Sequence, residues 1–405
     1  MLEARLPDTS TTHTVQPATW RERLLEAWQA WRDGVLISPD FQRRAARSWW
    51  MRPIARRRAR ALFDLVAGFV YSQVLLACVR LRLFDRLAGG PLTAAELQRA
   101  LDLPADGTER LLAAAVALEL LDKRTSRGQV RYGLGKLGAP MVANVAVAAM
   151  VEHHAVLYGD LTDPVALLKG GTAPALSRYW AYASSAAPGE LPPAAVNEYS
   201  ALMSASQPLV ADEVLDAYDI SQHRCLLDVG GGQGRFLLAA ARRSGTLQLK
   251  LFDLPGVVPI AQTNFAAAGV ATRASVCGGD FTRDALPGGA DVASLIRVIY
   301  DHPDERAATI LAAVYAALPP GGTLLLAEPM AGASGARRMG DAYFNFYLLA
   351  MQGGRSRSAA ELTRLIKAAG FEQVRELSTP IPLQVSVLIA RKPARKPARK
   401  PEPKT

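Results

Sequence analysis

The sequence CLLDVGGGQGRF at residues 225–236 reads as a short buried strand, a glycine-rich turn and the start of a helix that runs from Phe236 to Arg243. Glycines at positions 230, 232 and 234 let the chain turn sharply, and they let the backbone approach a ligand without a β-carbon in the way. The N-terminus of the following helix attracts an anionic group. The stretch therefore predicts a ligand site at the end of a strand in an α/β sheet.

The spacing of these glycines resembles the D-x-G-x-G-x-G pattern of S-adenosylmethionine (SAM) methyltransferases. Asp228 precedes Gly230, Gly232 and Gly234 in that pattern. A dinucleotide fingerprint needs its third glycine at position 235, where this chain has an arginine. A glycine-rich turn in an ordinary α/β sheet remains the alternative on this motif alone.

Acidic residues follow the next predicted strands. Asp253, in the sequence FDLP with Leu254, ends the strand over 247–252 and is placed to bind both ribose hydroxyls of a nucleoside. Asp280 and Phe281 end the third strand, where the acid can accept from an adenine amino group and the ring can stack on adenine. Helical patterns alternate with the strands, which predicts a doubly wound, Rossmann-like sheet with the ligand at the carboxyl ends of its strands.

The whole chain has 405 residues, enough for two or three domains, and half of them are hydrophobic. Its three cysteines lie in apolar runs and are expected to be buried and reduced. We expect no signal peptide and no membrane-spanning helix, because the most apolar segment, Phe63 to Val79, contains Asp64 and reads as a core helix. These features favour a cytoplasmic protein. No C-x-x-C or H-E-x-x-H motif supports a metal site.

The positive charge is concentrated at the two ends of the chain. Residues 1–62 hold twelve arginines and six acids, and residues 391–405 hold seven basic residues and one acid. The C-terminal repeat predicts a disordered tail. Five of the six tryptophans lie among the arginines of the first fifty residues. Such helices either contact a membrane surface, here the cytoplasmic membrane, or pack their tryptophans on the protein body.

The pattern divides the chain into five parts: a basic, Trp-rich head (1–55), a winged-helix domain (56–140), a helical connector lining the substrate site (141–205), the SAM-binding domain (206–390) and the tail (391–405). The winged helix is predicted from helices over 59–81, 93–100 and 106–119 and from a hairpin over 121–124 and 130–133. A regulator that binds nucleic acid is an alternative from another class. The third helix argues against it, because this helix is acidic and apolar, which suits burial against another subunit.

The order of these parts, with GGDF at 278–281 and GGRSRS at 353–358, resembles plant-type and bacterial small-molecule O-methyltransferases over about residues 60–390. The arginine run at 52–60, the sequence YSQVLL at 71–76 and Glu152-His153-His154 resemble the acyclic hydroxycarotenoid O-methyltransferases of phototrophic bacteria. The resemblance implies a homodimer that methylates the tertiary hydroxyl at a carotenoid end. Methylation of a bacteriochlorophyll precursor or another large apolar ring is the alternative within enzymes.

The resemblance also implies which residues contact SAM. The positions that match the family's SAM contacts are Gly230, Gly232, Asp253, Asp280, Phe281 and Arg297. The family's His-Asp-Trp motif, whose histidine is the general base, reads Tyr300-Asp301-His302 here. A supporting glutamate is retained as Glu328, and a second is replaced by Ser356.

The change at position 300 bears on the mechanism. The phenol of Tyr300 is neutral at pH 7, so it can orient the substrate oxygen but is a poor proton acceptor. The proton then passes to His302, His153, His154 or water.

Overall fold

The computed structural model describes residues 19–126, 128–180, 193–380 and 385–394; for residues 193–201 and 205 it describes the backbone alone. The chain divides into two compact units, Met1–Ala77 and Cys78–Thr405, and each unit is described by itself. The first eighteen residues of the predicted head, part of the connector and the tail from residue 395 lie outside the described residues.

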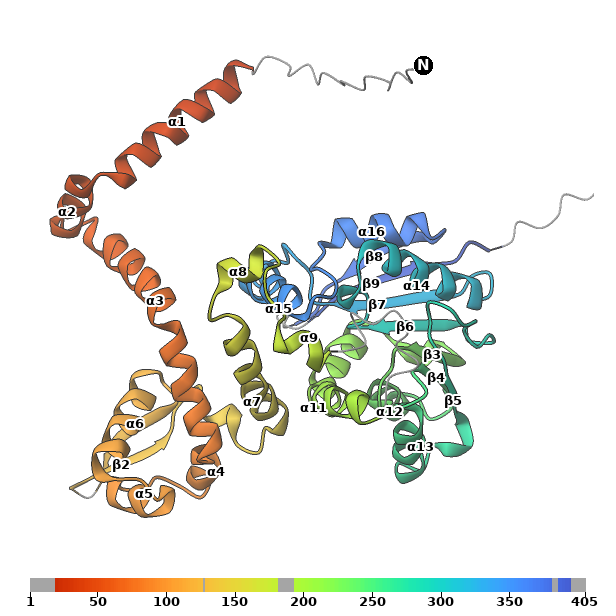
Figure 1. Ribbon diagram of the computed structural model, residues 1–405, viewed down its shortest axis with the longest axis horizontal. Coiled ribbons are helices and arrows are strands. Elements are labelled where there is room, and N and C mark those ends of the chain that lie inside the picture. The colour runs from red at the N-terminus through yellow and green to blue at the C-terminus, as the bar shows by residue number, and fades with distance from the viewer. Residues whose placement is uncertain (1–18, 127, 181–192, 381–384, 395–405) are drawn as a thin grey trace, which may run out of the picture. The chain divides into compact units, whose positions relative to one another are not determined.

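The first unit is a series of helices: α1 (Trp20–Ile37), α2 (Pro39–Arg47) and most of α3 (Arg52–Arg80). Thr19 and Glu22 form a capping box at the start of α1, and Ser38 caps α2. No residue of α1 is buried. In Figure 1 these helices run in red and orange from the N-terminal end.

Helix α3 bears on two expectations from the sequence, and it corrects the one that this segment is a core helix. An 18-residue window within it has a mean hydropathy of 1.9, so by length and composition it could cross a membrane. Only 11% of that window is buried, so the segment expected as a core helix is largely exposed. Its exposed large apolar side chains from residue 62 onward are Leu62, Phe63, Leu65, Val66, Phe69 and Val70. These side chains are 45–73% exposed, so the described residues leave this apolar face of the helix uncovered.

The second unit begins with the rest of the predicted winged-helix part, because its first predicted helix, over 59–81, falls mostly in α3 of the first unit. The rest consists of α4 (Leu83–Leu87), α5 (Ala94–Leu101), α6 (Ala105–Ala117) and the antiparallel hairpin of β1 (Leu121–Ser126) and β2 (Gln129–Leu134). Thr93 and Glu96 form a capping box at the start of α5. Among the described residues, the helices that connect this part to the sheet are α7 (Val145–Asp160), α8 (Pro164–Leu168), α9 (Ala175–Tyr179) and α11 (Pro193–Ala217).

A seven-stranded sheet forms the centre of the second unit, in the order β5-β4-β3-β6-β7-β9-β8. The strands are β3 (Cys225–Val229), β4 (Gln248–Asp253), β5 (Ala274–Gly278), β6 (Val292–Ile296), β7 (Thr323–Glu328), β8 (Glu372–Leu377) and β9 (Ser386–Arg391). β3 to β7 pair in parallel, and β9 is antiparallel to β7 and β8. The chain starts in the middle at β3, moves outward through β4 and β5, and returns to the other side at β6.

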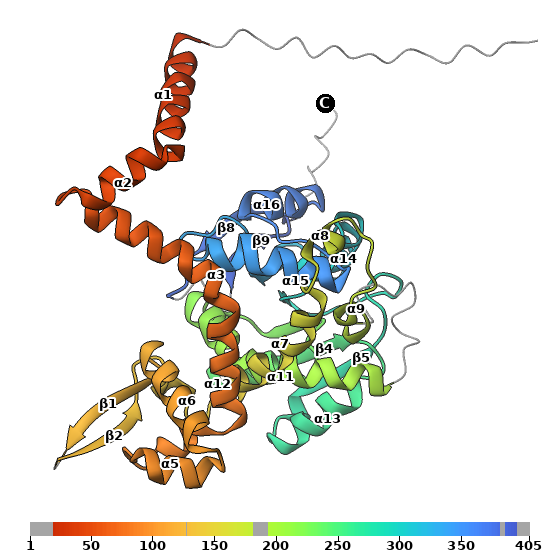
Figure 2. The same ribbon diagram turned by 60° about the vertical axis from the view of Figure 1, so that its left-hand side comes forward.

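Helices cover both faces of this sheet (Figures 1 and 2). One face packs against α11, α12 (Arg235–Arg243) and α13 (Val258–Ala267). The other packs against α14 (Asp304–Ala317) and α16 (Ala359–Ala368). The doubly wound α/β fold with a preceding winged helix is therefore confirmed. The π-helix η6 (Arg338–Tyr343) and α15 (Phe344–Met351) lie between β7 and α16 in the chain and pack with α7 and α9.

Two details differ from the sequence expectations. The sequence from Val292 to Val298 reads as one strand, but β6 ends at Ile296, because Arg297 takes a left-handed conformation with φ +58° and turns the chain. Cys277, expected to be buried, is exposed because β5 is the edge strand of the sheet. Cys78 and Cys225 are buried as expected.

Candidate active site

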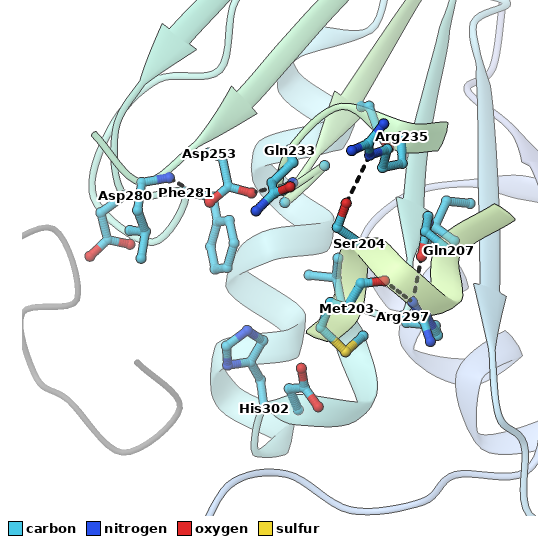
Figure 3. A pocket seen from close by; sticks show the side chains of 18 of the residues that line it. Met203, Ser204, Gln207, Gln233, Arg235, Asp253, Asp280, Phe281, Arg297 and His302 are labelled. Carbon is cyan, nitrogen blue, oxygen red and sulfur yellow. Dashed lines mark hydrogen bonds between the residues drawn. The ribbon is translucent and has the colours of Figure 1, made fainter. Parts of the chain in front are cut away.

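The first cavity of the second unit opens at the carboxyl ends of the parallel strands, where the strand order reverses between β3 and β6. Figure 3 shows the side chains that line it. The loops after β3, β4, β5 and β6 all contribute to its wall, as does α11. Every SAM-binding residue expected from the sequence, except Gly234, lies on this wall.

The glycine turn after β3 has the backbone geometry that its sequence requires. Gly230, Gly232 and Gly234 all have positive φ, at +69°, +58° and +77°. A β-carbon at Gly230 would come within 2.9 Å of Val298, and one at Gly234 within 2.5 Å of the Phe265 ring. Gly234 therefore supports the turn through its packing on α13, while Gly230 and Gly232 face the cavity.

Asp253 holds the glycine turn and faces the cavity. Its carboxylate accepts hydrogen bonds from the backbone N–H of Gly232 and of Leu254, both at 2.7 Å. Burial raises the pKa of Asp253 to about 6, against the opposing effect of these two N–H groups. Each carboxylate oxygen has a further lone pair that can accept a ribose hydroxyl.

Asp228 lies beneath the turn. Its carboxylate accepts a hydrogen bond from the Ser294 hydroxyl of β6 at 2.6 Å, and burial raises its pKa to about 7. A β-carbon at Gly231 would come within 2.5 Å of this carboxylate, so the backbone packs directly on Asp228. This acid supports the turn from below while its side chain reaches the cavity wall.

Asp280, Phe281 and His302 form the adjacent part of the wall (Figure 3). The Asp280 carboxylate accepts from the backbone N–H and the hydroxyl of Thr282, at 2.8 and 2.6 Å. The rings of Phe281 and His302 meet edge to face, with centroids 5.5 Å apart. Burial lowers the pKa of His302 to about 3, so this imidazole is neutral at pH 7. His302 thus lies on the cofactor side, away from the other candidate bases.

Helix α11 closes the other side of the cavity, which the sequence did not reveal. The Arg235 guanidinium donates to the Ser204 hydroxyl at 2.8 Å. Arg297 donates to the Ser206 hydroxyl at 3.0 Å. It also donates to the Gln207 side chain (Figure 3). Other wall residues missed by sequence reasoning are Met203, Gln233, Thr282, Asp301 and Arg306. Most of them lie outside the motifs, and only the fold brings them to the site.

A second cavity, with a volume of about 620 Å³, adjoins the first. Its wall comes mainly from α7, α11, η6 and α15 and is mostly apolar: Ala146, Val147, Met150, Val151, Leu202, Leu209, Ala336, Met339, Phe344 and Met351. Ligand cavities of this size and character bind small organic molecules. This cavity therefore suits a large apolar substrate.

Three residues, Met203, Arg297 and Asp301, line both cavities. They mark the place where a group held in one cavity meets a group held in the other. Asp301 is 5% exposed, so its carboxyl group lies at this junction almost out of contact with water. The motif at 300–302 contained this residue, but sequence reasoning assigned it no role.

The turn that carries Tyr300, Asp301 and His302 is the 3₁₀ helix η5 (Ile299–Asp301), and two buried side chains fix it. The Glu328 carboxylate accepts from the backbone N–H of Val298 and of Ile299, at 3.1 and 2.7 Å. Burial raises the pKa of Glu328 to about 8. Arg357, from the GGRSRS motif, donates to the carbonyl oxygens of Ile299 and His302, at 3.0 and 2.7 Å. Both residues position the turn.

Tyr300 lines the second cavity, and its ring meets Phe344 edge to face at 5.9 Å. Burial raises the pKa of the Tyr300 phenol well above its usual value near 10. The phenol therefore stays neutral and can donate a hydrogen bond into the cavity. It does not act as a base near pH 7.

The two adjacent histidines of α7 bond to two tyrosines one helical turn apart. His154 contacts the Met150 carbonyl through Nδ1, so its Nε2 accepts from the Tyr343 hydroxyl at 2.8 Å. The Tyr347 hydroxyl accepts from Trp180 Nε1 at 2.8 Å and bonds His153 Nε2 at 2.8 Å. His154 lines the second cavity, whereas His153 does not. Burial lowers the pKa of His153 to about 4, which makes it a weak proton acceptor.

The first cavity fits SAM. Gly230 and Gly232 leave room for close approach of a ligand, Asp253 offers acceptors for ribose hydroxyls, and Asp280 with Phe281 suits adenine. Among the described residues, no group of three or more His, Cys, Asp or Glu side chains could hold a metal ion.

Comparisons with known proteins agree with this geometry. A family model for the O-methyltransferase domain matches residues 160–372, and one for the O-methyltransferase dimerisation domain matches residues 63–144. Demethylspheroidene O-methyltransferase of Cereibacter sphaeroides is 44% identical over 357 residues, which cover 88% of this chain and 93% of the relative. The enzyme of the same name from Rhodobacter capsulatus is 41% identical over 342 residues, 84% of each chain.

The fold is similar to solved structures as well. Human N-acetylserotonin methyltransferase in complex with SAM superposes with a TM-score of 0.68 at 26% identity, covering 83% of this chain and 98% of that one. PigF with S-adenosylhomocysteine (SAH) gives a TM-score of 0.63 at 25% identity, covering 82% and 99%. The part of α3 that is exposed from Phe63 onward lies within the match to the dimerisation domain.

Proposed function

The chain belongs to the O-methyltransferase family, and from this membership we propose that it transfers a methyl group from SAM to the tertiary hydroxyl of an acyclic hydroxycarotenoid. The observation that carries the proposal is the large apolar cavity that adjoins the cofactor cavity at Met203, Arg297 and Asp301. The names of the two relatives at 44% and 41% identity support a carotenoid substrate.

In the reaction, SAM supplies a methyl group made electrophilic by the sulfonium sulfur. Asp253 and the glycine turn hold the cofactor from the β3 and β4 side. The apolar cavity holds the hydrocarbon and excludes water, so the hydroxyl oxygen is brought into line at the junction. Alignment of the reacting atoms supplies much of the rate when the nucleophile is weak, as a tertiary alcohol is.

We infer that Asp301 accepts the proton. The bond from the hydroxyl oxygen to the methyl carbon forms while the carbon–sulfur bond breaks, which leaves SAH, and the hydroxyl proton passes to the Asp301 carboxylate. Asp301 lines both cavities, whereas His302 lines only the first and His153 neither. The pKa of about 3 at His302 and of about 4 at His153 further weaken both imidazoles as bases.

Tyr300 orients the substrate hydroxyl in this proposal. Its neutral phenol lines the apolar cavity one residue before Asp301, so it can donate to the substrate oxygen while the carboxylate receives the proton. His154 is another polar group of the cavity wall, with its Nε2 bonded to Tyr343.

We further propose that the protein is a homodimer. The family match to the dimerisation domain at 63–144 supports this, as does the exposed apolar face of α3 within that match. Burial of such a face in a second subunit lowers the free energy of the assembly, because apolar surface is removed from water.

An assay with SAM and a panel of acceptors tests the proposed function. The full chain is incubated with acyclic carotenoids that carry a tertiary hydroxyl, with the matching carotenoids that lack it, and with a chlorophyll precursor. A mass gain of one methyl group only on the hydroxylated carotenoids is the expected result. Methylation of the chlorophyll precursor alone would contradict the proposal.

A further inference from the structure

The tryptophans of α1 occupy one face of the helix. With an advance of about 100° per residue, Trp20, Leu24, Trp28 and Trp31 fall within an arc of about 80°. All four side chains are exposed, from 53% at Trp28 to 67% at Trp20. The helix thus carries a narrow aromatic stripe that nothing in its own unit covers.

The charges of α1 are ordered around this stripe. On the same helical projection, Arg21 and Arg32 lie along one edge of the stripe and Arg23 lies along the other. The acids Glu22, Glu26 and Asp33 lie on the opposite face. Two of the arginines pack on the rings: Arg21 lies 5.3 Å from the centroid of Trp20, and Arg32 lies 5.4 Å from that of Trp28.

We propose that this face of α1 binds the surface of an anionic lipid bilayer. An interfacial helix places Trp and Leu at the boundary between headgroups and acyl chains and flanks them with basic residues at the level of the phosphates. In α1 the arginines stand at that level and the acids point away from the bilayer. Residues 19–62 together carry eleven arginines against four acids, which complements an anionic surface.

A second copy of the chain suits this face less well. The family match to the dimerisation domain begins at residue 63, after α1 and α2, and it contains the exposed apolar residues of α3 from Phe63 onward. Protein interfaces are also depleted of charge at their centre, whereas arginines border the aromatic stripe of α1 closely on both edges. The membrane proposal goes beyond the proposed methyl transfer and does not depend on it.

The distribution of tryptophan supplies a direct readout. Five of the six tryptophans lie between residues 20 and 50, and the sixth, Trp180, is 3% exposed. The full chain is mixed with vesicles of equal parts phosphatidylglycerol and phosphatidylcholine. We expect the emission to shift to the blue and to be quenched by lipids with brominated acyl chains. Vesicles of phosphatidylcholine alone should bind more weakly, and added salt should weaken binding to the anionic vesicles.

Matched triple variants test the face. Trp20→Ser, Trp28→Ser and Trp31→Ser together should lower vesicle binding at least about tenfold in a flotation assay. Glu22→Gln, Glu26→Gln and Asp33→Asn on the opposite face should leave binding unchanged or increase it, and Gln can keep the capping role at position 22. Equal SAM affinity in both variants shows that the fold is intact. Methyl transfer to a detergent-dispersed acceptor tests the proposed function separately.

Three outcomes would overturn the proposal. The first is vesicle binding by the tryptophan variant that equals that of the parent. The second is a change in sedimentation of this variant without any loss of vesicle binding, which would assign the face to a second copy. The third is an emission maximum that is already blue and insensitive to vesicles, which would mean that the tryptophans pack on the protein body.

Discussion

Gly354 packs directly against the backbone of Tyr300, so that a β-carbon at position 354 would overlap the Tyr300 carbonyl oxygen. The GGRSRS motif therefore acts on the active site through the backbone. The missing side chain of Gly354 lets the η5 turn pack closely, and Arg357 donates hydrogen bonds to carbonyl oxygens of this turn. The motif and the site are about fifty residues apart in the sequence, yet they form one rigid support.

Gly354→Ala tests this support. The added methyl group must displace the η5 turn, which shifts Tyr300 and Asp301 and costs about 1–3 kcal/mol of stability. We expect turnover to fall more than tenfold, because small displacements of reacting groups are costly. Steady-state kinetics and thermal unfolding measure both effects. Gly245→Ala, which faces open space, is the control and should change neither.

Asp253→Ala should weaken SAM binding by about 2–3 kcal/mol, because the charged acceptor of the ribose hydroxyls is lost from the cavity. Isothermal titration calorimetry measures the effect. A SAM affinity equal to that of the parent chain would show that Asp253 does not contact the cofactor.

The pH dependence of SAM binding has a defined sign. Burial raises the pKa of Asp253 to about 6, and only its ionised form accepts both ribose hydroxyls. Affinity should therefore be constant above this pKa and fall, by up to about tenfold per pH unit, as the pH drops below 6. Asp253→Asn should bind SAM weakly and without this pH dependence. A parent affinity that is flat from pH 5 to pH 7 would contradict the assignment.

Tyr300→Phe removes the phenol hydroxyl and keeps the ring that packs on Phe344. If the hydroxyl orients the substrate oxygen, turnover falls by about tenfold to a thousandfold, while SAM affinity hardly changes because Tyr300 does not line the first cavity. Full activity in this variant would show that the match to the family's base position carries no function.

Asp301→Asn keeps the shape of the side chain and removes the proton acceptor. We expect a loss of turnover of about 10²–10⁴-fold. His302→Gln and His153→Gln are the matched comparisons and should cost less, since neither imidazole lines the apolar cavity. If His154→Gln shows the largest loss instead, the proton passes to the histidine paired with Tyr343.

The proposed dimer depends on the exposed face of α3. Leu65→Asp with Phe69→Asp should shift the protein to monomers in analytical ultracentrifugation, because two charges would be placed in an apolar interface. Val165→Asp, at a residue 56% exposed outside the dimerisation match, is the control. If the double variant sediments as the parent does, the dimer interface lies outside this face of α3.

The cofactor side of the site could be predicted from sequence because it depends on local chemistry. Few structures other than a ligand-binding turn fit closely spaced glycines that are followed by an acid at the end of the next strand. The structure places Gly230, Gly232 and Asp253 on the cavity wall, as this pattern predicts. The winged helix was predictable for the same reason, through the capping box of Thr93 and the hairpin that follows.

The catalytic side could not be predicted because it depends on the local backbone geometry of one short turn. Arg297 leaves the strand with a positive φ, and the short 3₁₀ turn that follows points consecutive residues in different directions. Tyr300 faces the apolar cavity, His302 faces the cofactor cavity, and Asp301 lies between them. Helix and strand periodicities do not predict the directions of three consecutive side chains in such a turn. The tyrosine partners of the α7 histidines are about 190 residues away, and only the fold reveals them.

The hydrogen bonds of His153 and His154 to Tyr347 and Tyr343 connect two walls of the apolar cavity that are far apart in the sequence. One wall, α7, precedes the sheet in sequence, and another, η6 with α15, follows β7. These walls are held together by two side-chain hydrogen bonds and by apolar packing of α7 on α15, whereas every strand of the sheet can stay paired when they separate. We expect a rod-like molecule to enter sideways, between the walls, and not to thread through an opening end first. Once inside, it bridges both walls and slows their separation, so its residence time and the hydrogen exchange of α7 are set by the same motion.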